Sequence, residues 1–346
     1  MHAITVVPRQ QGTARLDDIA EPPAQEGAIL VEAVAVGVCG TDHEILSGDY
    51  GWSPPGRERL VVGHESLARV IEAPSSSEVR AGDLIVPIVR VPDPVPCESC
   101  AAGEWDMCRN GSYTEHGIKA LDGFARERFR VAPPFLVRVD PALGVHGVLL
   151  EPTSVVAKAW EQIRRIGSRS HWRPRRALVL GAGPVGLLAA MIGVQQKLEV
   201  HVLDRVTSGP KPDLVKALGA TYHTGKAADV KDVDVVIEAT GAASLVFDAM
   251  RCVVPDGIVC LTGVAAGHGT VDVDAAALNN QLVLGNNVVV GSVSANQRHF
   301  SAGAAALAAA DPAWLDGLIT RQMDLARWRE AYQPAAGDIK TILRFS

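Results

Sequence analysis

Residues 178–190 read LVLGAGPVGLLAA, and this stretch decides the fold of the second half of the chain. A short apolar run, typical of a buried strand, leads into Gly181, Gly183 and Gly186, and a helix-like segment follows. The first glycine allows a tight turn, the second lets a pyrophosphate approach the backbone, and the third permits close helix packing. Free N–H groups at the helix start would bind phosphate. The stretch therefore predicts a dinucleotide site; a glycine-rich turn without a nucleotide is the alternative.

The acid expected to contact the adenosine ribose follows at the end of the next strand-like run, EVHVLD. Asp204 lies eighteen residues after Gly186, and its carboxylate would accept both ribose hydroxyls of NAD and repel the 2′-phosphate of NADP. Arg205 follows directly and would suit that phosphate. We therefore expect NAD as the preferred cofactor, with NADP as the alternative.

The order of the predicted elements indicates two domains. The first third has short β-like runs separated by Pro, Gly and Ser turns, whereas strands and helices alternate from Ala177 onward. Alternation of this kind predicts a doubly wound parallel sheet. A chain of 346 residues is long for one core. We expect a β-rich domain from residues 1–155 and 295–346, and an α/β nucleotide domain from residues 156–294.

Composition limits the possible partners and the compartment. The chain is 47% hydrophobic, and its net charge of −6 comes without a long run of one sign, so we expect no nucleic-acid partner. No apolar run reaches membrane-spanning length and no secretory signal is visible, so we expect no membrane partner and a cytoplasmic location. Six cysteines in a cytosolic chain favour metal binding or buried thiols over disulfides.

Residues with zinc-binding side chains are scattered through the first half. Cys39 begins the stretch CGTDHE directly after an apolar run, His64 and Glu65 lie in VVGHES, and Glu151 lies in LLEPTSVV. Thiolate, imidazole and carboxylate are the ligands of catalytic zinc. Each residue alone has an ordinary interpretation, such as a buried thiol, a strand-capping histidine or a surface acid. Because a dinucleotide site follows in the same chain, we interpret them together as a catalytic zinc site.

These motifs carry a family resemblance. GVCGTD, VVGHES, LLEPTSVV and LVLGAGPVGLL resemble the zinc-dependent medium-chain dehydrogenases. VPIVR, HGIKALDGFARERF, PPFLVRVDP, EATGAASLVFDAM and GSVSANQRHF are similar to the archaeal glucose (aldose) dehydrogenases within that superfamily. The resemblance covers almost the whole chain. It implies an α/β fold in which a GroES-like β-rich catalytic domain accompanies a doubly wound Rossmann domain, and hydride transfer from a sugar hydroxyl to nicotinamide.

The resemblance also implies roles for individual residues. Cys39 and His64 would hold the catalytic zinc. Glu65 would be a ligand or an exchangeable near-ligand, and Glu151 would bind the metal directly or through water. Thr41 matches the hydroxyl that relays the proton from the substrate alcohol. Three further residues match the edge of the cofactor cleft, although an apolar β wall would also produce such sequences: Thr240, Val264 and Ser292.

A second zinc site is expected in a lobe near residues 93–116. Cys97, Cys100 and Cys108 form C-x2-C-x7-C, and the family often carries C-x2-C-x2-C-x7-C around a structural zinc. Pro94 stands where the first cysteine of that pattern would fall. Asp93 or Glu115 would then supply the fourth ligand. The alternative is a lobe that has lost its metal.

The expected substrate is a small polyhydroxy molecule. Glu115 matches an acid that contacts sugar in the glucose enzymes, and His116 beside it would either help or support it. Ser294 stands where those enzymes have a sugar-contacting asparagine, and residues 284–286 lack a histidine that they carry. A cyclitol, a polyol or a simple alcohol therefore stays open beside glucose. A non-catalytic nucleotide-binding protein and a zinc-free reductase are more remote alternatives.

The apolar strand NNVVVGSV resembles one that pairs across a two-fold axis in this superfamily. An exposed strand edge of this kind usually needs a partner. We therefore expect a homodimer or a homotetramer.

Overall fold

The computed structural model describes residues 1–265 and 270–345, which divide into two compact units. The first unit contains Met1–Ser154, Ser294–Ala309 and the chain from Ile319 onward; the second contains Val155–Val293 and Ala310–Leu318. The sequence analysis placed residues 310–318 with the first unit. They pack with the second instead, because Trp314 is buried there and its indole N–H donates to the Leu214 carbonyl at 2.9 Å.

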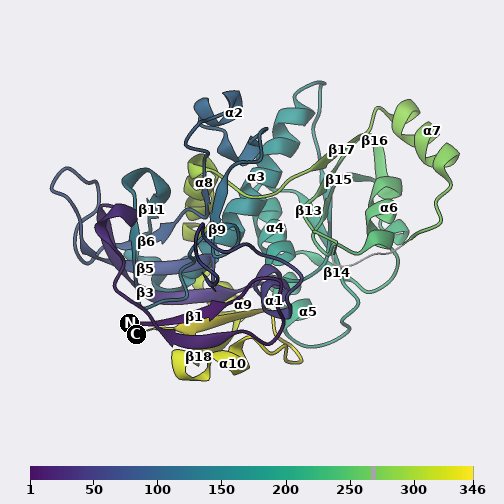
Figure 1. Cartoon of the computed structure of the whole chain (residues 1–346). Coiled ribbons are helices and arrows are strands. Elements are labelled where there is room, and N and C mark those ends of the chain that lie inside the picture. Colours follow the sequence, from purple (N-terminus) through teal and green to yellow (C-terminus); the bar gives the residue numbers. More distant parts are fainter. Residues whose placement is uncertain (266–269, 346) are drawn as a thin grey trace. The chain divides into compact units, whose positions relative to one another are not determined.

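The second unit is built on a six-stranded parallel sheet in the order β14-β13-β12-β15-β16-β17 (Figure 1). Its strands are β12 (Arg176–Leu180), β13 (Glu199–Leu203), β14 (Thr221–His223), β15 (Val233–Glu238), β16 (Val253–Leu261) and β17 (Val288–Gly291). Its helices are α4 (Pro184–Gln195), α5 (Pro210–Ala217), α6 (Ala243–Cys252), α7 (Ala275–Gly285), α9 (Pro312–Leu318) and most of α3 (Leu150–Gly167). The strand order reverses between β12 and β15, as in doubly wound dinucleotide-binding folds. The sequence prediction of this fold is confirmed.

The apolar runs of the sequence form the interior of this sheet. Leu178 on β12 pairs with Val236 on β15, and Ile258 on β16 pairs with Val288 on β17. Parallel strands covered on both faces read as continuous hydrophobic runs rather than alternating ones. Helix α4 is also apolar around most of its circumference, because it packs on β12, β13 and β15.

The first unit is β-rich. Its main sheet has the order β11-β6-β5-β3-β19-β18, with β10 also paired to β3. These strands are β3 (Ile29–Val38), β5 (Glu65–Glu72), β6 (Leu84–Pro87), β10 (Arg128–Val131), β11 (Leu136–Arg138), β18 (Ile319–Asp324) and β19 (Lys340–Arg344). Two three-stranded sheets contain β1 (His2–Val6), β2 (Arg15–Asp18) and β4 (Leu60–Val61), and β7 (Arg90–Val91), β8 (Thr114–His116) and β9 (Ala120–Leu121).

Short helices connect the strands of the first unit. They are α1 (Gly40–Ser47), α2 (Glu98–Ala101), α8 (Gln297–Ala308) and α10 (Trp328–Ala331). Short 3-10 helices lie at Ala24–Glu26, Trp105–Met107, Pro133–Phe135, Pro141–Leu149, Ala227–Asp229 and Leu325–Arg327, the fifth of them in the second unit. Apolar side chains from the two ends of the chain share one core, in which Ile4 and Val36 pack with Leu343. None of the described helices is long and apolar enough to span a membrane.

Candidate metal centre and nucleotide site

Cys39 lies where β3 ends and α1 begins. It is the N-cap of α1: its Sγ accepts the Thr41 N–H at 3.3 Å, and Asp42 Oδ2 accepts the Cys39 N–H at 3.0 Å. Such reciprocal bonds satisfy N–H groups that a helix start leaves free. The positive end of the helix also favours a negatively charged ligand at this position. Thr41 is half-buried in the first turn of α1. It follows Cys39 by two residues in the chain, and its side chain carries a hydroxyl group.

His64 meets this thiol from a second segment. Cys39 Sγ and His64 Nε2 are 3.1 Å apart, and His64 Nδ1 lies 3.4 Å from Asp42 Oδ1. Burial lowers the pKa of His64, but the charges of Cys39 and Asp42 outweigh it and raise the pKa well above its usual range. The surroundings of the ring therefore stabilise positive charge, as a cation site requires.

Glu65 completes a group of three metal-binding side chains. Ligand atoms of Cys39, His64 and Glu65 all lie within 4.8 Å of one another. Thiolate, imidazole and carboxylate suit zinc, and the Asp42 carboxylate, 3.4 Å from His64 Nδ1, lies where a carboxylate commonly orients a zinc-bound histidine. The donor set of this group therefore fits zinc.

Glu151 lies near this group without belonging to it. It is half-buried in the first turn of α3. Burial raises the pKa of Glu151 to about 7, and the charge of Glu65 adds to the rise, against the opposing charge of His64. Its carboxyl therefore exchanges a proton near neutral pH. Whether it binds metal directly or through water stays a prediction.

The three lobe cysteines also converge. The sulfurs of Cys97, Cys100 and Cys108 lie within 4.8 Å of one another. Backbone N–H groups, first that of Arg109, lower the pKa of Cys97 to about 6, which favours the thiolate form that binds metal.

Among the described residues, no Asp, Glu or His places a ligand atom within 4.8 Å of all three lobe cysteines. The Asp93 carboxylate accepts the Asn110 side-chain amide at 2.6 Å and lies outside the 4.8 Å cysteine group. Asn110 Oδ1 lies 2.9 Å from Cys108 Sγ. Sequence reasoning missed Asn110, whose oxygen contacts a lobe cysteine, whereas neither Asp93 nor Glu115 joins the cysteine group. Asp93 stays a prediction as a ligand.

The predicted cofactor residues all follow carboxyl ends of parallel strands in the second unit. Gly181 and Gly183 follow β12, Asp204 and Arg205 follow β13, Thr240 follows β15, Val264 follows β16 and Ser292 follows β17. This is the edge of a doubly wound sheet where ligands bind. A cavity of about 530 Å³ is lined by the first five of these residues, with Lys211.

The glycine turn is packed as the motif requires. A Cβ on Gly186 would lie 1.9 Å from the Gly181 carbonyl oxygen, so only glycine fits there. Gly181 itself has φ +103°, a conformation that side chains rarely allow. Thr240 packs directly against Gly181, because its methyl would be 2.7 Å from a Cβ there. Val264 is exposed, and Ser292 is buried with no hydrogen-bond partner for its Oγ within the described residues.

Asp204 is held in place by several donors. Its Oδ2 accepts the Ala182 N–H at 2.7 Å and Lys211 Nζ at 3.2 Å, and its Oδ1 accepts the Val206 N–H at 3.0 Å. Burial raises the pKa of Asp204, but these donors outweigh it and lower the pKa below its usual range. The residue is therefore a fixed negative charge beside two cations, Arg205 and Lys211.

The predicted substrate residues lie in the first unit and differ in how many of their polar atoms are already bonded. Glu115 is buried, and its Oε1 accepts Arg90 Nε at 2.9 Å. His116 uses Nδ1 to bond the Asp122 carbonyl at 2.7 Å, which leaves only Nε2 for a ligand. Ser294 is half-buried with φ +61°, a left-handed conformation that asparagine adopts more readily than serine. The family's asparagine would therefore suit this backbone.

His116 predicts an acid-sensitive contribution to stability. Burial and the nearby Arg126 lower the pKa of His116 from 6.5 to about 4. Below pH 6.5 the unfolded chain therefore binds a proton that the folded chain does not, and stability falls as the pH drops. Between about pH 7 and 5, the unmodified protein should lose about 2 kcal/mol of unfolding free energy through His116. His116→Gln should lack this part of the loss, as measured by urea unfolding at both pH values. His171→Gln, at an exposed histidine, should leave the pH slope unchanged; equal slopes in all three proteins would contradict the prediction.

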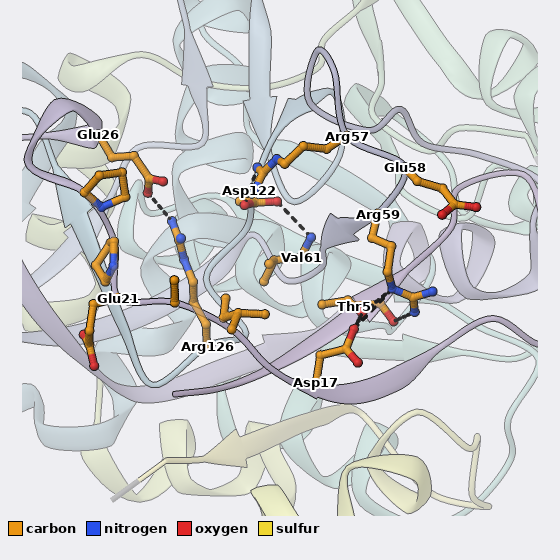
Figure 2. A pocket seen from close by; sticks show the side chains of 14 residues that line it. Thr5, Asp17, Glu21, Glu26, Arg57, Glu58, Arg59, Val61, Asp122 and Arg126 are labelled. Carbon is orange, nitrogen blue, oxygen red and sulfur yellow. Dashed lines mark hydrogen bonds and ion pairs between the residues drawn. The ribbon is translucent and has the colours of Figure 1, made fainter.

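A separate cavity of about 480 Å³ lies in the first unit and shares no residue with either cysteine group (Figure 2). Its guanidinium groups are paired with carboxylates: Arg57 with Asp122, Arg59 with Asp17 and Arg126 with Glu26. Because each cation already has an acid partner, we interpret this cavity as an ion-pair network that joins β1 and β2 to neighbouring loops.

Two residues beside the metal centre were not identified from sequence. The sequence analysis gave Asp42 no role of its own, although an acid three residues after an N-cap is a signal for a capping box. Lys340 bonds Glu65 from 275 residues away along the chain, and no local pattern could have revealed it.

Comparisons with known proteins show to which family this chain belongs. Residues 25–141 match the family model "Alcohol dehydrogenase GroES-like domain", and residues 144–345 match "Glucose dehydrogenase C-terminus". The chain is 39% identical to glucose 1-dehydrogenase 1 of Caldivirga maquilingensis, over 100% of this chain and 99% of that protein. It is 40% identical to glucose 1-dehydrogenase of Halobacterium salinarum, over 98% of each.

A solved structure extends the likeness to the fold of the whole chain. Glucose dehydrogenase of Haloferax mediterranei, in complex with NADP, Zn and gluconolactone, matches with a TM-score of 0.92 and 33% identity, covering 100% of this chain and 99% of that one. The match covers both units, including the motifs from which the family was expected. This chain belongs to the glucose dehydrogenase family of zinc-dependent alcohol dehydrogenase-like oxidoreductases, which act on CH–OH groups.

Proposed function

We propose that this protein oxidises the anomeric hydroxyl of an aldose such as glucose to the lactone, with hydride transfer to NAD(P). The observation that carries the proposal is the convergence of Cys39, His64 and Glu65 within 4.8 Å in a chain that also has a glycine-rich nucleotide turn. The Haloferax relative, which was solved with NADP, Zn and gluconolactone, supports the same substrate class.

Cys39 and His64 would hold the catalytic zinc, with Glu65 and Glu151 as further or exchangeable ligands. Zinc supplies a Lewis acid that lowers the pKa of a bound hydroxyl, and the nicotinamide accepts the hydride. The Asp42 carboxylate, 3.4 Å from His64 Nδ1, would help to orient the imidazole. Cys97, Cys100 and Cys108 would hold a structural zinc.

Thr41 is proposed to accept the hydroxyl proton of the substrate. Its backbone N–H is bonded to Cys39 Sγ, which fixes the residue beside the metal ligand. In this reaction the C1–H bond would break with its electron pair passing to a bound nicotinamide, the O–H proton would leave through Thr41 toward solvent, and a C1=O bond would form. The net products are lactone, reduced cofactor and one proton.

Cofactor choice is proposed to depend on Asp204. Its fixed negative charge favours NAD, whereas Arg205 and Lys211 at the same cavity make NADP acceptable. We expect Asp204→Asn to raise the ratio of kcat/KM for NADP to that for NAD by about tenfold, because one like charge near a 2′-phosphate is removed. Steady-state kinetics with both cofactors measures this ratio. Asp213→Asn, an exposed acid on α5, is the matched control, and an unchanged ratio in Asp204→Asn contradicts the assignment.

The substrate class is tested by following reduced nicotinamide across aldoses, cyclitols, polyols and simple alcohols with zinc present. The proposal expects the highest kcat/KM on an aldose such as glucose or galactose. Turnover confined to cyclitols or simple alcohols would keep the zinc chemistry and reject the aldose. Ser294→Asn restores the family's residue at a backbone position that suits it, and should raise kcat/KM for glucose without changing KM for the cofactor.

A related polyhydroxy compound is the second candidate substrate. Two departures favour it: Ser294 has a shorter side chain than the family's asparagine, and residues 284–286 contain no histidine. Either loss leaves a sugar hydroxyl without a partner, and a site built to pair hydroxyls discriminates strongly when one is unmatched. The proposed chemistry at Cys39 and His64 is the same for both substrates.

We propose a homodimer or homotetramer formed through the second unit. Strand β17 lies at the edge of its sheet, and α7 just before it exposes Val283 and Leu284, with fractional exposures of 64% and 81%. A second copy that extends the sheet would cover both features. Light scattering at micromolar concentration should give at least twice the mass of the chain, and Val283→Glu/Leu284→Glu should lower it toward the monomer. A monomeric unmodified protein would refute this proposal.

We also propose a cytoplasmic location. All six cysteines are free thiols in the structure. Four of them belong to the two candidate metal groups, which would need these thiols reduced. The cytosol keeps thiols in this state.

A further inference from the structure

Lys340 is a buried ammonium group beside the metal centre. Only 1% of its surface is exposed. It begins β19, which pairs antiparallel with β3 so that Thr341 lies opposite Val38. This register places Lys340 next to the point where β3 ends and Cys39 follows. A lysine is almost never fully buried unless its charge is paired.

The ammonium contacts neighbours of both metal ligands. Lys340 Nζ donates to Glu65 Oε2 at 2.5 Å and to the Val38 carbonyl at 3.1 Å. Val38 precedes Cys39, and Glu65 follows His64. One cation therefore ties together the two segments that carry the thiol and the imidazole.

The space around the Glu65 carboxylate is shaped for this contact. Gly37 lies opposite Glu65 in the β3–β5 ladder, and a Cβ on Gly37 would be 2.1 Å from Glu65 Oε2. Any larger residue would displace the carboxylate. Glu65 itself is only 2% exposed, so its charge needs a cation at all times. Two cations compete for that role: the Lys340 ammonium and a metal bound at Cys39 and His64.

We propose that Lys340 is a positioning residue that draws the Glu65 carboxylate away from the metal, weakening its ligation and keeping a coordination place for the substrate. The inference rests on the assignment of Cys39 and His64 as zinc ligands. Loss of the ammonium leaves Glu65 with the metal as its remaining cation. Zinc should then bind more tightly. The zinc-free protein has lost the one cation that pairs with Glu65 among residues 1–265 and 270–345, so it should be destabilised more than the zinc-loaded protein.

The test measures zinc affinity by competition with a chromogenic chelator. For each variant, zinc bound at Cys39 and His64 is taken as the zinc that is lost when Cys39→Ser is added to that variant. This difference excludes zinc bound at the cysteine lobe. Lys340→Met should lower the zinc Kd about tenfold or more. It should also lower the thermal midpoint of the zinc-free protein more than that of the zinc-loaded protein. Lys340→Arg keeps the charge and should stay close to the unmodified protein in both measurements.

A coupled variant shows whether Lys340 acts through Glu65. The gain in zinc affinity from Lys340→Met should be larger with Glu65 present than in a Glu65→Gln background. Lys340→Gln keeps an N–H donor for Glu65 and Val38, so it serves as the uncharged variant if Lys340→Met does not fold, and should also tighten zinc binding.

Three results would overturn the inference. Unchanged or weaker zinc binding, with equal loss of thermal stability in the zinc-free and zinc-loaded forms, would make Lys340 a purely structural residue. An equal gain in both Glu65 backgrounds would exclude positioning through that carboxylate. If Cys39→Ser lowers the zinc content of the otherwise unmodified protein by nothing, there is no zinc site at Cys39. This result is obtained before any Lys340 variant is made.

Discussion

Replacement of Cys39 by serine should abolish turnover. The thiolate is one of the two ligands on which the proposed zinc depends most, and metal Lewis-acid catalysis supplies several kcal/mol to the transition state. We expect kcat/KM to fall by roughly a thousandfold or more. Metal analysis should show the loss of about one zinc per chain, with zinc at the cysteine lobe retained.

Cys252→Ser is the matched control for this result. Cys252 is partly buried at the end of α6 in the second unit and belongs to neither metal group. Its replacement should change neither zinc content nor kcat/KM. Full activity in Cys39→Ser would reject the zinc mechanism, and no activity in the unmodified protein on any alcohol would favour a non-catalytic nucleotide-binding role.

Replacement of Thr41 by valine should give the second largest loss. Valine preserves the shape of the side chain and the backbone N–H that bonds Cys39 Sγ, but it removes the hydroxyl. General acid–base groups contribute about 10²- to 10⁴-fold, so we expect kcat to fall within that range while zinc content stays unchanged. The loss should be greatest at low pH, where hydroxide cannot replace the relay.

Thr41→Ser separates the hydroxyl from the rest of the side chain. It keeps the oxygen and removes only a methyl group, so it should retain at least about a tenth of the activity. If serine and valine reduce kcat equally, packing at the start of α1 and not proton transfer explains the effect. If valine leaves kcat unchanged, Thr41 has no part in the relay.

The nucleotide unit was predictable because its determinants are local. Gly181, with its positive φ, and Gly186, which packs on the Gly181 carbonyl, each satisfy a steric need within a few residues of chain, and the apolar runs around them have the length of buried strands. The family resemblance then supplied the candidate metal ligands. In the structure Cys39, His64 and Glu65 converge, and their role as ligands stays a prediction.

Features that depend on distant partners were not predictable in the same way. Lys340 reads as an ordinary strand lysine, and only the pairing of β19 with β3 brings it to Glu65. Residues 310–318 follow a helix of the first unit in sequence, but Trp314 binds the Leu214 carbonyl of the second. Asn110 escaped because an amide is a less usual zinc ligand than an acid. For Lys340 and Trp314 the deciding contact spans a separation that no local pattern reports, whereas the Asn110 contact with Cys108 is local and was missed because of its chemical type.

The position of β19 within its sheet has a consequence for biosynthesis. It lies between β3 and β18, and it supplies the ammonium that neutralises Glu65. A ribosome delivers β3 some three hundred residues before it delivers β19. The sheet that carries the metal ligands therefore cannot close until residue 344 has been translated, whereas the parallel sheet of the second unit is complete earlier. Domains usually fold in the order of their synthesis. Here the unit that starts first should finish last, and its thiols stay exposed to stray metal ions and oxidants in the interval.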